Sequence, residues 1–128
     1  MQTKKNPMRG IRGAITVERD HPQEIAAASL LLFETIVEKN ELQPDDITAL
    51  FITVTPDLRS AFPAQTIRQI EKYRYLPIMC ALEIPVQSAV NNCIRFMVIA
   101  YCPMRDQKSI HHVYLGRAQQ LRTDLEVD

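Results

Sequence analysis

Cys93-Ile-Arg-Phe-Met-Val-Ile-Ala-Tyr101 is the most apolar strand-like stretch of the chain, and it predicts a β-strand. Successive side chains of a strand point to opposite faces, so Arg95 shares a face with Met97 and Ile99. A guanidinium stays charged and is costly to bury without a partner. We therefore expect an anionic group in front of Arg95, either an acid of the chain or a ligand.

Three other polar side chains interrupt apolar strand patterns in the same way. Arg12 lies within Arg9-Gly-Ile-Arg-Gly-Ala-Ile-Thr-Val17, Glu83 ends an apolar stretch that begins at Leu76, and Tyr114 follows His112-Val. Arginines and a phenol together suit a small molecule with several negative charges. The residues alone leave two simpler readings open: each arginine could pair with an internal acid, and Glu83 could be an ordinary solvated carboxylate.

Composition limits the class of protein. The 128 residues predict one domain over residues 8–128 after a flexible extension over residues 1–7. Basic and acidic residues balance at 15 each, which argues against nucleic acid or an anionic membrane as a partner. The three cysteines form no CxxC pair and lie in apolar surroundings, so we expect reduced thiols and a cytoplasmic location. No apolar run reaches membrane-spanning length.

Periodicity and turn residues predict an α+β fold, with a mixed sheet and helices packed on one face. The expected strands cover 9–18, 47–55, 76–83, 93–101 and 112–118. The expected helices cover 22–40, opened by Asp20 and Pro22, then 64–73 and 86–92. The other face of the sheet would expose apolar side chains such as Met97, so we expect the protein to self-associate.

Signals for covalent or cofactor chemistry are weak. Cys80 has no adjacent base, and packing is its simpler role; strand alternation also places it on the face opposite Glu83. The histidines His21, His111 and His112 form no metal pair and read as solvated side chains. With three glycines and no phosphate-binding motif, we predict neither a metal nor a cofactor.

The order of several short motifs resembles the trimeric, single-domain chorismate mutases of mixed α/β architecture, as distinct from the all-helical mutases. The likeness extends from about Met8 to Leu125. It is carried by Met8-Arg-Gly-Ile-Arg-Gly-Ala14, Thr16-Val-Glu-Arg-Asp20, Thr55-Pro-Asp-Leu58, Phe62-Pro-Ala64, Cys80–Glu83, Cys93-Ile-Arg95, His112-Val-Tyr-Leu115, Leu121-Arg122 and Asp124-Leu125.

The resemblance implies an isomerase that rearranges chorismate to prephenate on the route to phenylalanine and tyrosine. This Claisen-type reaction proceeds within one molecule and uses no cofactor, metal, nucleophile or proton carrier. The protein would hold the substrate in a compact conformer and stabilise charge as the ether bond breaks. The resemblance further implies a homotrimer with a pseudo-α/β-barrel core and active sites between neighbouring subunits.

The resemblance also assigns roles to individual residues. Arg95 would face the ether oxygen, where negative charge develops, and Glu83 would accept a hydrogen bond from the ring hydroxyl and balance positive charge on the ring. Arg12 and Tyr114 would bind the side-chain carboxylate. The remaining substrate contacts would be Cys80, Met79, Phe62, Ala64, Arg68 and Leu121.

Two departures from the family pattern stand out. Gln65 replaces a lysine that members often carry at the mouth of the site, and the turn over Pro103–Lys108 holds one extra residue.

Two other functions remain open at this point. A trimeric imine deaminase would share only the fold and would use Glu83 to activate water, whereas a binding module would hold an aromatic-pathway metabolite without turnover.

Overall fold

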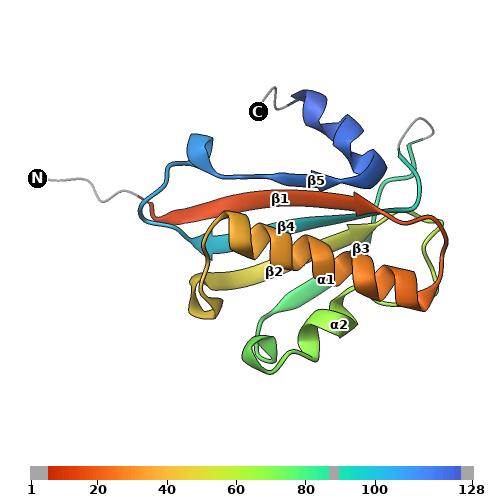
Figure 1. Cartoon of the computed structure of the whole chain (residues 1–128), viewed down its shortest axis with the longest axis horizontal. Helices are drawn as coiled ribbons and strands as arrows, with labels where there is room; N and C mark the ends of the chain where they lie inside the picture. The colour runs from red at the N-terminus through yellow and green to blue at the C-terminus, as the bar shows by residue number, and fades with distance from the viewer. Residues whose placement is uncertain (1–5, 87–89, 125–128) are drawn as a thin grey trace, which may run out of the picture.

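Residues 6–86 and 90–124 are described by the structure, a computed structural model, which contains one five-stranded sheet covered by helices (Figure 1). The strands are β1 (Met8–Thr16), β2 (Ile47–Val54), β3 (Ile78–Leu82), β4 (Cys93–Tyr101) and β5 (Val113–Leu115). The α-helices are α1 (Pro22–Lys39) and α2 (Ala64–Arg68). Short 3₁₀ helices are η1 (Pro44–Asp46), η2 (Glu71–Tyr73), η3 (Gln107–Ser109) and η4 (Gly116–Asp124).

The sheet is mixed, as predicted, and its strand order is β3-β2-β4-β1-β5. The apolar strand β4 occupies the centre and runs antiparallel to both neighbours, β1 and β2. The outer pairs, β2 with β3 and β1 with β5, are parallel. Each parallel pair needs a long connection between its strands, and a helix in that connection covers one face of the sheet.

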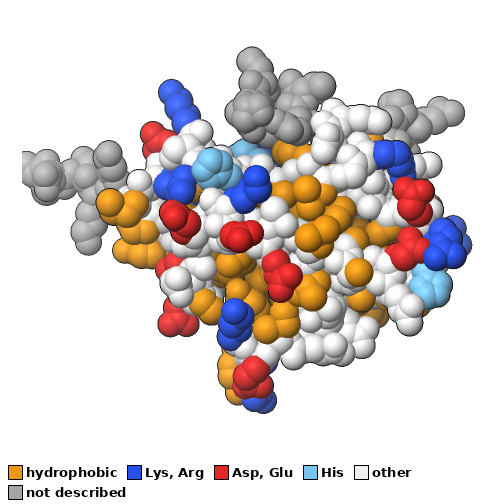
Figure 2. Space-filling model, in the orientation of Figure 1, with side chains coloured by type: hydrophobic (Ala, Val, Ile, Leu, Met, Phe, Trp, Pro, Cys, Tyr) orange, Lys and Arg blue, Asp and Glu red, His pale blue; other side chains and the backbone are white. Residues whose placement is uncertain are grey.

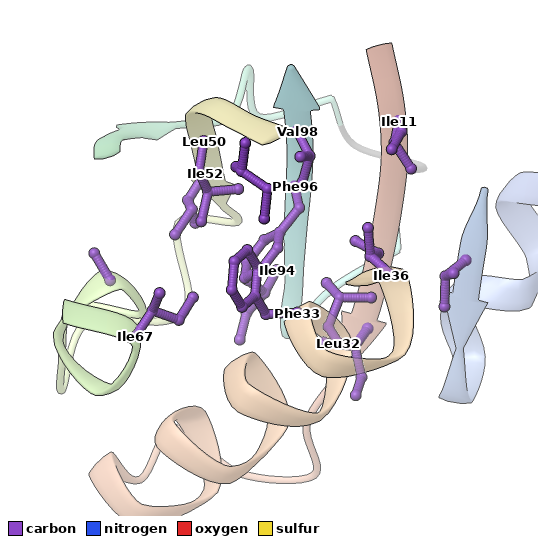
Figure 3. Close-up of a cluster of buried hydrophobic side chains, with 14 of the residues drawn as sticks. Ile11, Leu32, Phe33, Ile36, Leu50, Ile52, Ile67, Ile94, Phe96 and Val98 are labelled. Atoms are coloured by element: carbon purple, nitrogen blue, oxygen red, sulfur yellow. The ribbon is translucent and has the colours of Figure 1, made fainter. Parts of the chain in front are cut away.

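The core lies between this face and α1 (Figure 3). Phe33 of α1 is fully buried and packs edge-to-face on Tyr73, with ring centroids 4.9 Å apart, and against Phe96 of β4 at 6.4 Å. The predicted stripe of the helix is buried and consists of Ile25, Ala28, Leu32 and Ile36. We call the opposite face of the sheet, which neither α-helix covers, the open face.

The C-terminal segment differs from the prediction. Strand β5 ends at Leu115, before the expected Ala118, because Gly116 adopts a left-handed φ of +63° and turns the chain into η4. Ala118 of η4 then packs on Ala14 and Cys93, which belong to the open face. The α-helices therefore cover one face as expected, and η4 covers one end of the other.

Two predicted helices also need correction. The helix expected over 64–73 is divided into α2 and η2, with Ile70 extended between them. The helix expected over 86–92 is not formed at residues 86 and 90–92, and residues 87–89 lie outside the described chain. The predicted extension over 1–7 falls largely on undescribed residues, but the Pro7 carbonyl accepts a hydrogen bond of 2.8 Å from the Cys102 amide.

The start of α1 shows that Asp20 has another role than capping. His21 is the N-cap, and its Nδ1 accepts a 3.2 Å hydrogen bond from the Gln23 amide, so this histidine is not simply solvated. The carboxylate of Asp20 instead accepts from the amides of Arg59 and Ser60 at 3.1 and 3.0 Å. The hydrogen bonds from Ser60 are the main cause of a lowered Asp20 pKa. Asp20 therefore fixes the loop that leads to Phe62.

Close packing of α1 on β1 predicts the effect of adding one methyl group. A Cβ at Gly13 would lie 2.7 Å from Ile36 Cδ1, 3.1 Å from Leu32 Cδ1 and 3.3 Å from the Val113 carbonyl oxygen. We expect Gly13→Ala to lower the free energy of unfolding by about 1–3 kcal/mol, since overpacking strains a filled core. Urea denaturation measures this loss.

Gly10→Ala is the matched control, because it adds the same methyl group to the same strand on the open face. The new Cβ would make only an ordinary contact, 3.4 Å from Met97 Sδ. Equal stability losses in the two variants would contradict the packing explanation.

Candidate active site

A row of side chains crosses the open face at one level of the sheet. Strand register aligns Tyr114 of β5, Ala14 of β1, Arg95 of β4, Thr53 of β2 and Ala81 of β3. Residues paired in a ladder point to the same face, so β-sheet geometry brings together positions that lie far apart in the sequence. This row explains how polar side chains from several strands can lie close together, as the sequence predicts.

A cavity of about 440 Å³ lies over the row. Its walls combine cations, a phenol and apolar side chains, which suits an organic anion. The lining residues are Arg12, Gly13, Phe51, Thr53, Arg95, Phe96, Met97, Tyr114, Gln120 and Leu121. Four predicted site residues, Arg12, Arg95, Tyr114 and Leu121, are therefore brought together.

Glu83 joins this group through an ion pair with Arg95. The Arg95 Nε lies 3.1 Å from Glu83 Oε2, although its N–H is not aligned well enough for a hydrogen bond. The Glu83 side chain is only 13% exposed, whereas that of Arg95 keeps 43% of its surface. Arg95 can therefore pair with Glu83 and bind a ligand at the same time, because the exposed part of its side chain can still receive an anion.

Side chains from the segment before β5 fasten the strand that carries Arg12. The Gln107 amide both accepts from the Gly10 amide at 3.1 Å and donates to the Gly10 carbonyl at 2.7 Å. His112 Nδ1 accepts a 2.9 Å hydrogen bond from the Arg12 backbone amide. His112 is half-buried, so the expectation of a solvated histidine is wrong here. These contacts extend the β1–β5 pairing beyond the ladder itself.

Cys93 lies beneath the cavity, among Ala14, Ala118, Tyr114 and Leu121. Burial, followed by the negative charge of Glu83, raises the pKa of its thiol to about 11. The thiol stays protonated near neutral pH and therefore serves as a small packing group. All three cysteines, Cys80, Cys93 and Cys102, are described and are free.

The other predicted contacts lie elsewhere in the chain. Phe62, Cys80 and Gln65 line a second cavity of about 590 Å³. Cys80 and Glu83 are on opposite faces of the sheet, as strand alternation predicts, since Cys80 pairs with Ile52, whose side chain is buried in the core.

Three further predicted residues line neither cavity. Met79 is 67% exposed and pairs with Phe51 on the open face, whereas the side chain of Ala64 is fully buried. Arg68 is exposed on α2. One chain thus contains two separate groups of predicted site residues. The first lines the cavity on the open face, and the second lies on the helix-covered side and consists of Phe62, Cys80, Ala64 and Arg68.

Charges on the helix-covered face are mixed in sign, as Figure 2 shows for the described residues. Within residues 6–86 and 90–124, no group of three or more histidine, cysteine or acidic side chains is placed to hold a metal ion. The described helices include none that is both long and apolar enough to cross a bilayer.

Comparison with known proteins decides the family. The model of the family described as chorismate mutase type I matches residues 8–125. The chain belongs to the chorismate mutase type I family. The expected enzyme class, an isomerase, is confirmed by this match together with the relatives that follow.

Relatives of the family match over nearly their whole length. Chorismate mutase AroH of Bacillus subtilis (strain 168) is 39% identical over 120 residues, which cover 94% of each chain. Chorismate mutase AroH of Thermus thermophilus is 42% identical over 120 residues, covering 93% of this chain and 97% of the relative. A solved chorismate mutase from Clostridium thermocellum superposes with a TM-score of 0.82 at 40% identity, covering 87% and 97% of the two chains. This neighbour confirms the predicted fold class.

The sequence did not indicate six of the cavity's ten lining residues as site residues; these are Phe51, Thr53, Gln120, Gly13, Phe96 and Met97. A signal for the first two was present in β2, because Leu50, Ile52 and Val54 alternate with them and would point into the core. Gln120 had no such signal, since its position depends on the turn at Gly116.

Proposed function

We propose that this chain converts chorismate to prephenate at sites formed between neighbouring subunits of a homotrimer, for phenylalanine and tyrosine synthesis. The observation that carries the proposal is the cavity on the open face, which Arg95, Arg12 and Tyr114 line together and where Glu83 pairs with Arg95. The family match supports the reaction. Incubation of the purified protein with chorismate, with NMR identification of prephenate, tests it.

In the proposed mechanism Arg95 faces the ether oxygen of the substrate. As the ether bond breaks, negative charge develops on this oxygen, and a fixed cation stabilises it more in the transition state than in the ground state. The ion pair with Glu83 holds Nε of the guanidinium and leaves its other nitrogens for the substrate. Charge stabilisation of this kind requires no proton transfer and no covalent intermediate.

Glu83, Arg12 of β1 and Tyr114 of β5 would position the rest of the substrate. The Glu83 carboxylate accepts from the ring hydroxyl and balances positive charge that develops on the ring. Arg12 binds the side-chain carboxylate and Tyr114 donates a hydrogen bond to it. Holding the two reacting ends together in a compact conformer removes much of the entropic barrier of the rearrangement.

The second group of residues would complete the site from an adjacent subunit. Phe62 is 73% exposed and Met79 67% exposed, so their surfaces are free to meet another chain. We assign Phe62 and Ala64, together with Leu121 of the first cavity, to the apolar walls, Arg68 to the ring carboxylate, and Cys80 with the Met79 backbone to the ring hydroxyl. Phe62, Cys80 and Arg68 lie on the helix-covered side of the sheet, opposite the cavity on the open face, so a site that uses both sets would draw on two chains.

The open face supports the proposed trimer independently of the site. Register places Met97, Phe51 and Met79 side by side across three strands, and Phe51 and Tyr101 are 44% and 48% exposed. Burial of such a surface favours association, and we propose that it forms a pseudo-α/β-barrel core. Light scattering should give the mass of three chains of 14.7 kDa each.

Residues 8–128 would form the single chorismate mutase domain, with 1–7 as an extension and a cytoplasmic location. The family match over 8–125 supports the domain. Burial of Cys93 and Cys102 as free thiols supports a reducing compartment.

Gln65 predicts weakened substrate binding. It lines the second cavity as a neutral amide, where a lysine would add a charged contact to the dicarboxylate. We expect Gln65→Lys to lower KM about tenfold with little change in kcat, since a hydrogen bond to a charged group is worth about 1.5 kcal/mol or more. Steady-state kinetics of both proteins measures this, and an unchanged KM would contradict it.

A further inference from the structure

Glu83 and Arg95 are held together across an intervening strand. Glu83 follows the end of β3, its amide donates a 2.9 Å hydrogen bond to the Val54 carbonyl of β2, and Arg95 belongs to β4. Because β2 lies between β3 and β4, their backbones are about 10 Å apart, twice the spacing of neighbouring strands. The two side chains must therefore meet above a residue of β2.

Thr53 is the residue at that point. It pairs with Arg95 in the β2–β4 ladder and with Ala81, two residues before Glu83, in the β2–β3 ladder. Its Oγ1 donates a 2.7 Å hydrogen bond to Glu83 Oε2, the same oxygen that lies 3.1 Å from Arg95 Nε. Thr53 is half-buried and lines the cavity.

We propose that Thr53 is a positioning residue of the mutase, which orients the Glu83 carboxylate for the substrate and for Arg95. The short side chain leaves room for the ion pair above β2, and the hydroxyl fixes Oε2 so that Oε1 can face the ring. A short hydrogen bond to an ionised oxygen is among the stronger ones and is highly directional. This inference rests on the proposed role of Glu83.

Two substitutions distinguish a role of the Thr53 hydroxyl from the contribution of the Thr53 side chain to strand formation. Threonine and valine are both good strand formers, whereas serine is a poorer one. If Thr53 only supports β2, Thr53→Val should be the milder change. If it positions Glu83, Thr53→Ser should be the milder change, because serine keeps the donor.

We expect Thr53→Val to lower kcat/KM about tenfold or more, mainly through kcat, because a hydrogen bond to a charged group is lost. Thr53→Ser should stay within about threefold of the wild type. Thr48→Val is the matched control, since Thr48 is exposed on the same strand and lines neither described cavity. Steady-state kinetics and thermal melting of all variants give the comparison.

A double-mutant cycle with Glu83→Ala identifies the partner of the hydroxyl. Thr53→Val should have little further effect once Glu83 is absent. The inference is overturned if valine is as active as serine, or if the loss persists unchanged in the Glu83→Ala background. Failure of the proposed function is a different result: Glu83→Ala would then keep full activity, or the wild type would not turn over chorismate.

Discussion

Arg95→Ala will lower kcat by about a hundredfold to a thousandfold, the loss seen when one preorganised donor to a developing oxyanion is removed. The expected size follows from the position of Arg95, which projects into the cavity from the central strand with 43% of its side chain exposed. Water that fills the vacated space has no fixed charge and must reorganise during the reaction. Steady-state kinetics on chorismate measures the effect.

Two control variants distinguish the proposed stabilisation of the ether oxygen by Arg95 from the general effect of removing a positive charge. Arg74→Ala removes an exposed arginine whose ion pair with Glu71 lies on the surface after α2, and it should leave kcat unchanged. Arg95→Lys keeps a cation but loses the planar fork, so it should lie between wild type and alanine. A stable, folded Arg95→Ala protein with near wild-type kcat would contradict the electrostatic mechanism.

Two inactive variants should restore activity when they share a trimer. Arg95→Ala damages the group on the open face, and Arg68→Ala damages the group on the helix-covered side. In the proposed trimer, any assembly that contains both variants would have one of its three intersubunit sites with Arg95 and Arg68 intact. Doubly tagged heterotrimers should therefore show about one third of wild-type activity, because the proposed cyclic interface would be heterologous.

The matched control for this experiment carries both substitutions in the same chain. A homotrimer of that double variant has no intact site and should be inactive. Absence of recovery in purified heterotrimers would mean that Arg68 and Arg95 act within one chain, or that Arg68 does not contact the substrate.

Much of the fold follows from the sequence because its elements are long and periodic. Strand β4 was predicted over its observed range, and four of the six buried residues of α1 were predicted, all but Ser29 and Phe33. The errors occur where one residue changes the backbone path. Gly116 ends β5 three residues early, and nothing in the local pattern distinguishes its left-handed φ from an extended one.

The site was only partly predictable for a different reason. Arg12, Arg95 and Glu83 were visible as charges in apolar strands, and a charge in such a place requires a partner. Thr53 was not visible in this way, because threonine is an ordinary strand residue and its importance depends on register with Arg95. The alternation of apolar residues along a strand predicts which face of the sheet a side chain occupies. Its neighbours on that face depend on how the strands pair, which the sequence pattern does not show.

The most direct test is the rate at which purified protein consumes chorismate, followed by its absorbance in buffer with a chelator. Saturable turnover to prephenate, unaffected by the chelator, is the expected result. Binding of chorismate or prephenate without turnover would contradict the mutase mechanism and make the arginine-lined cavity a metabolite-binding site only.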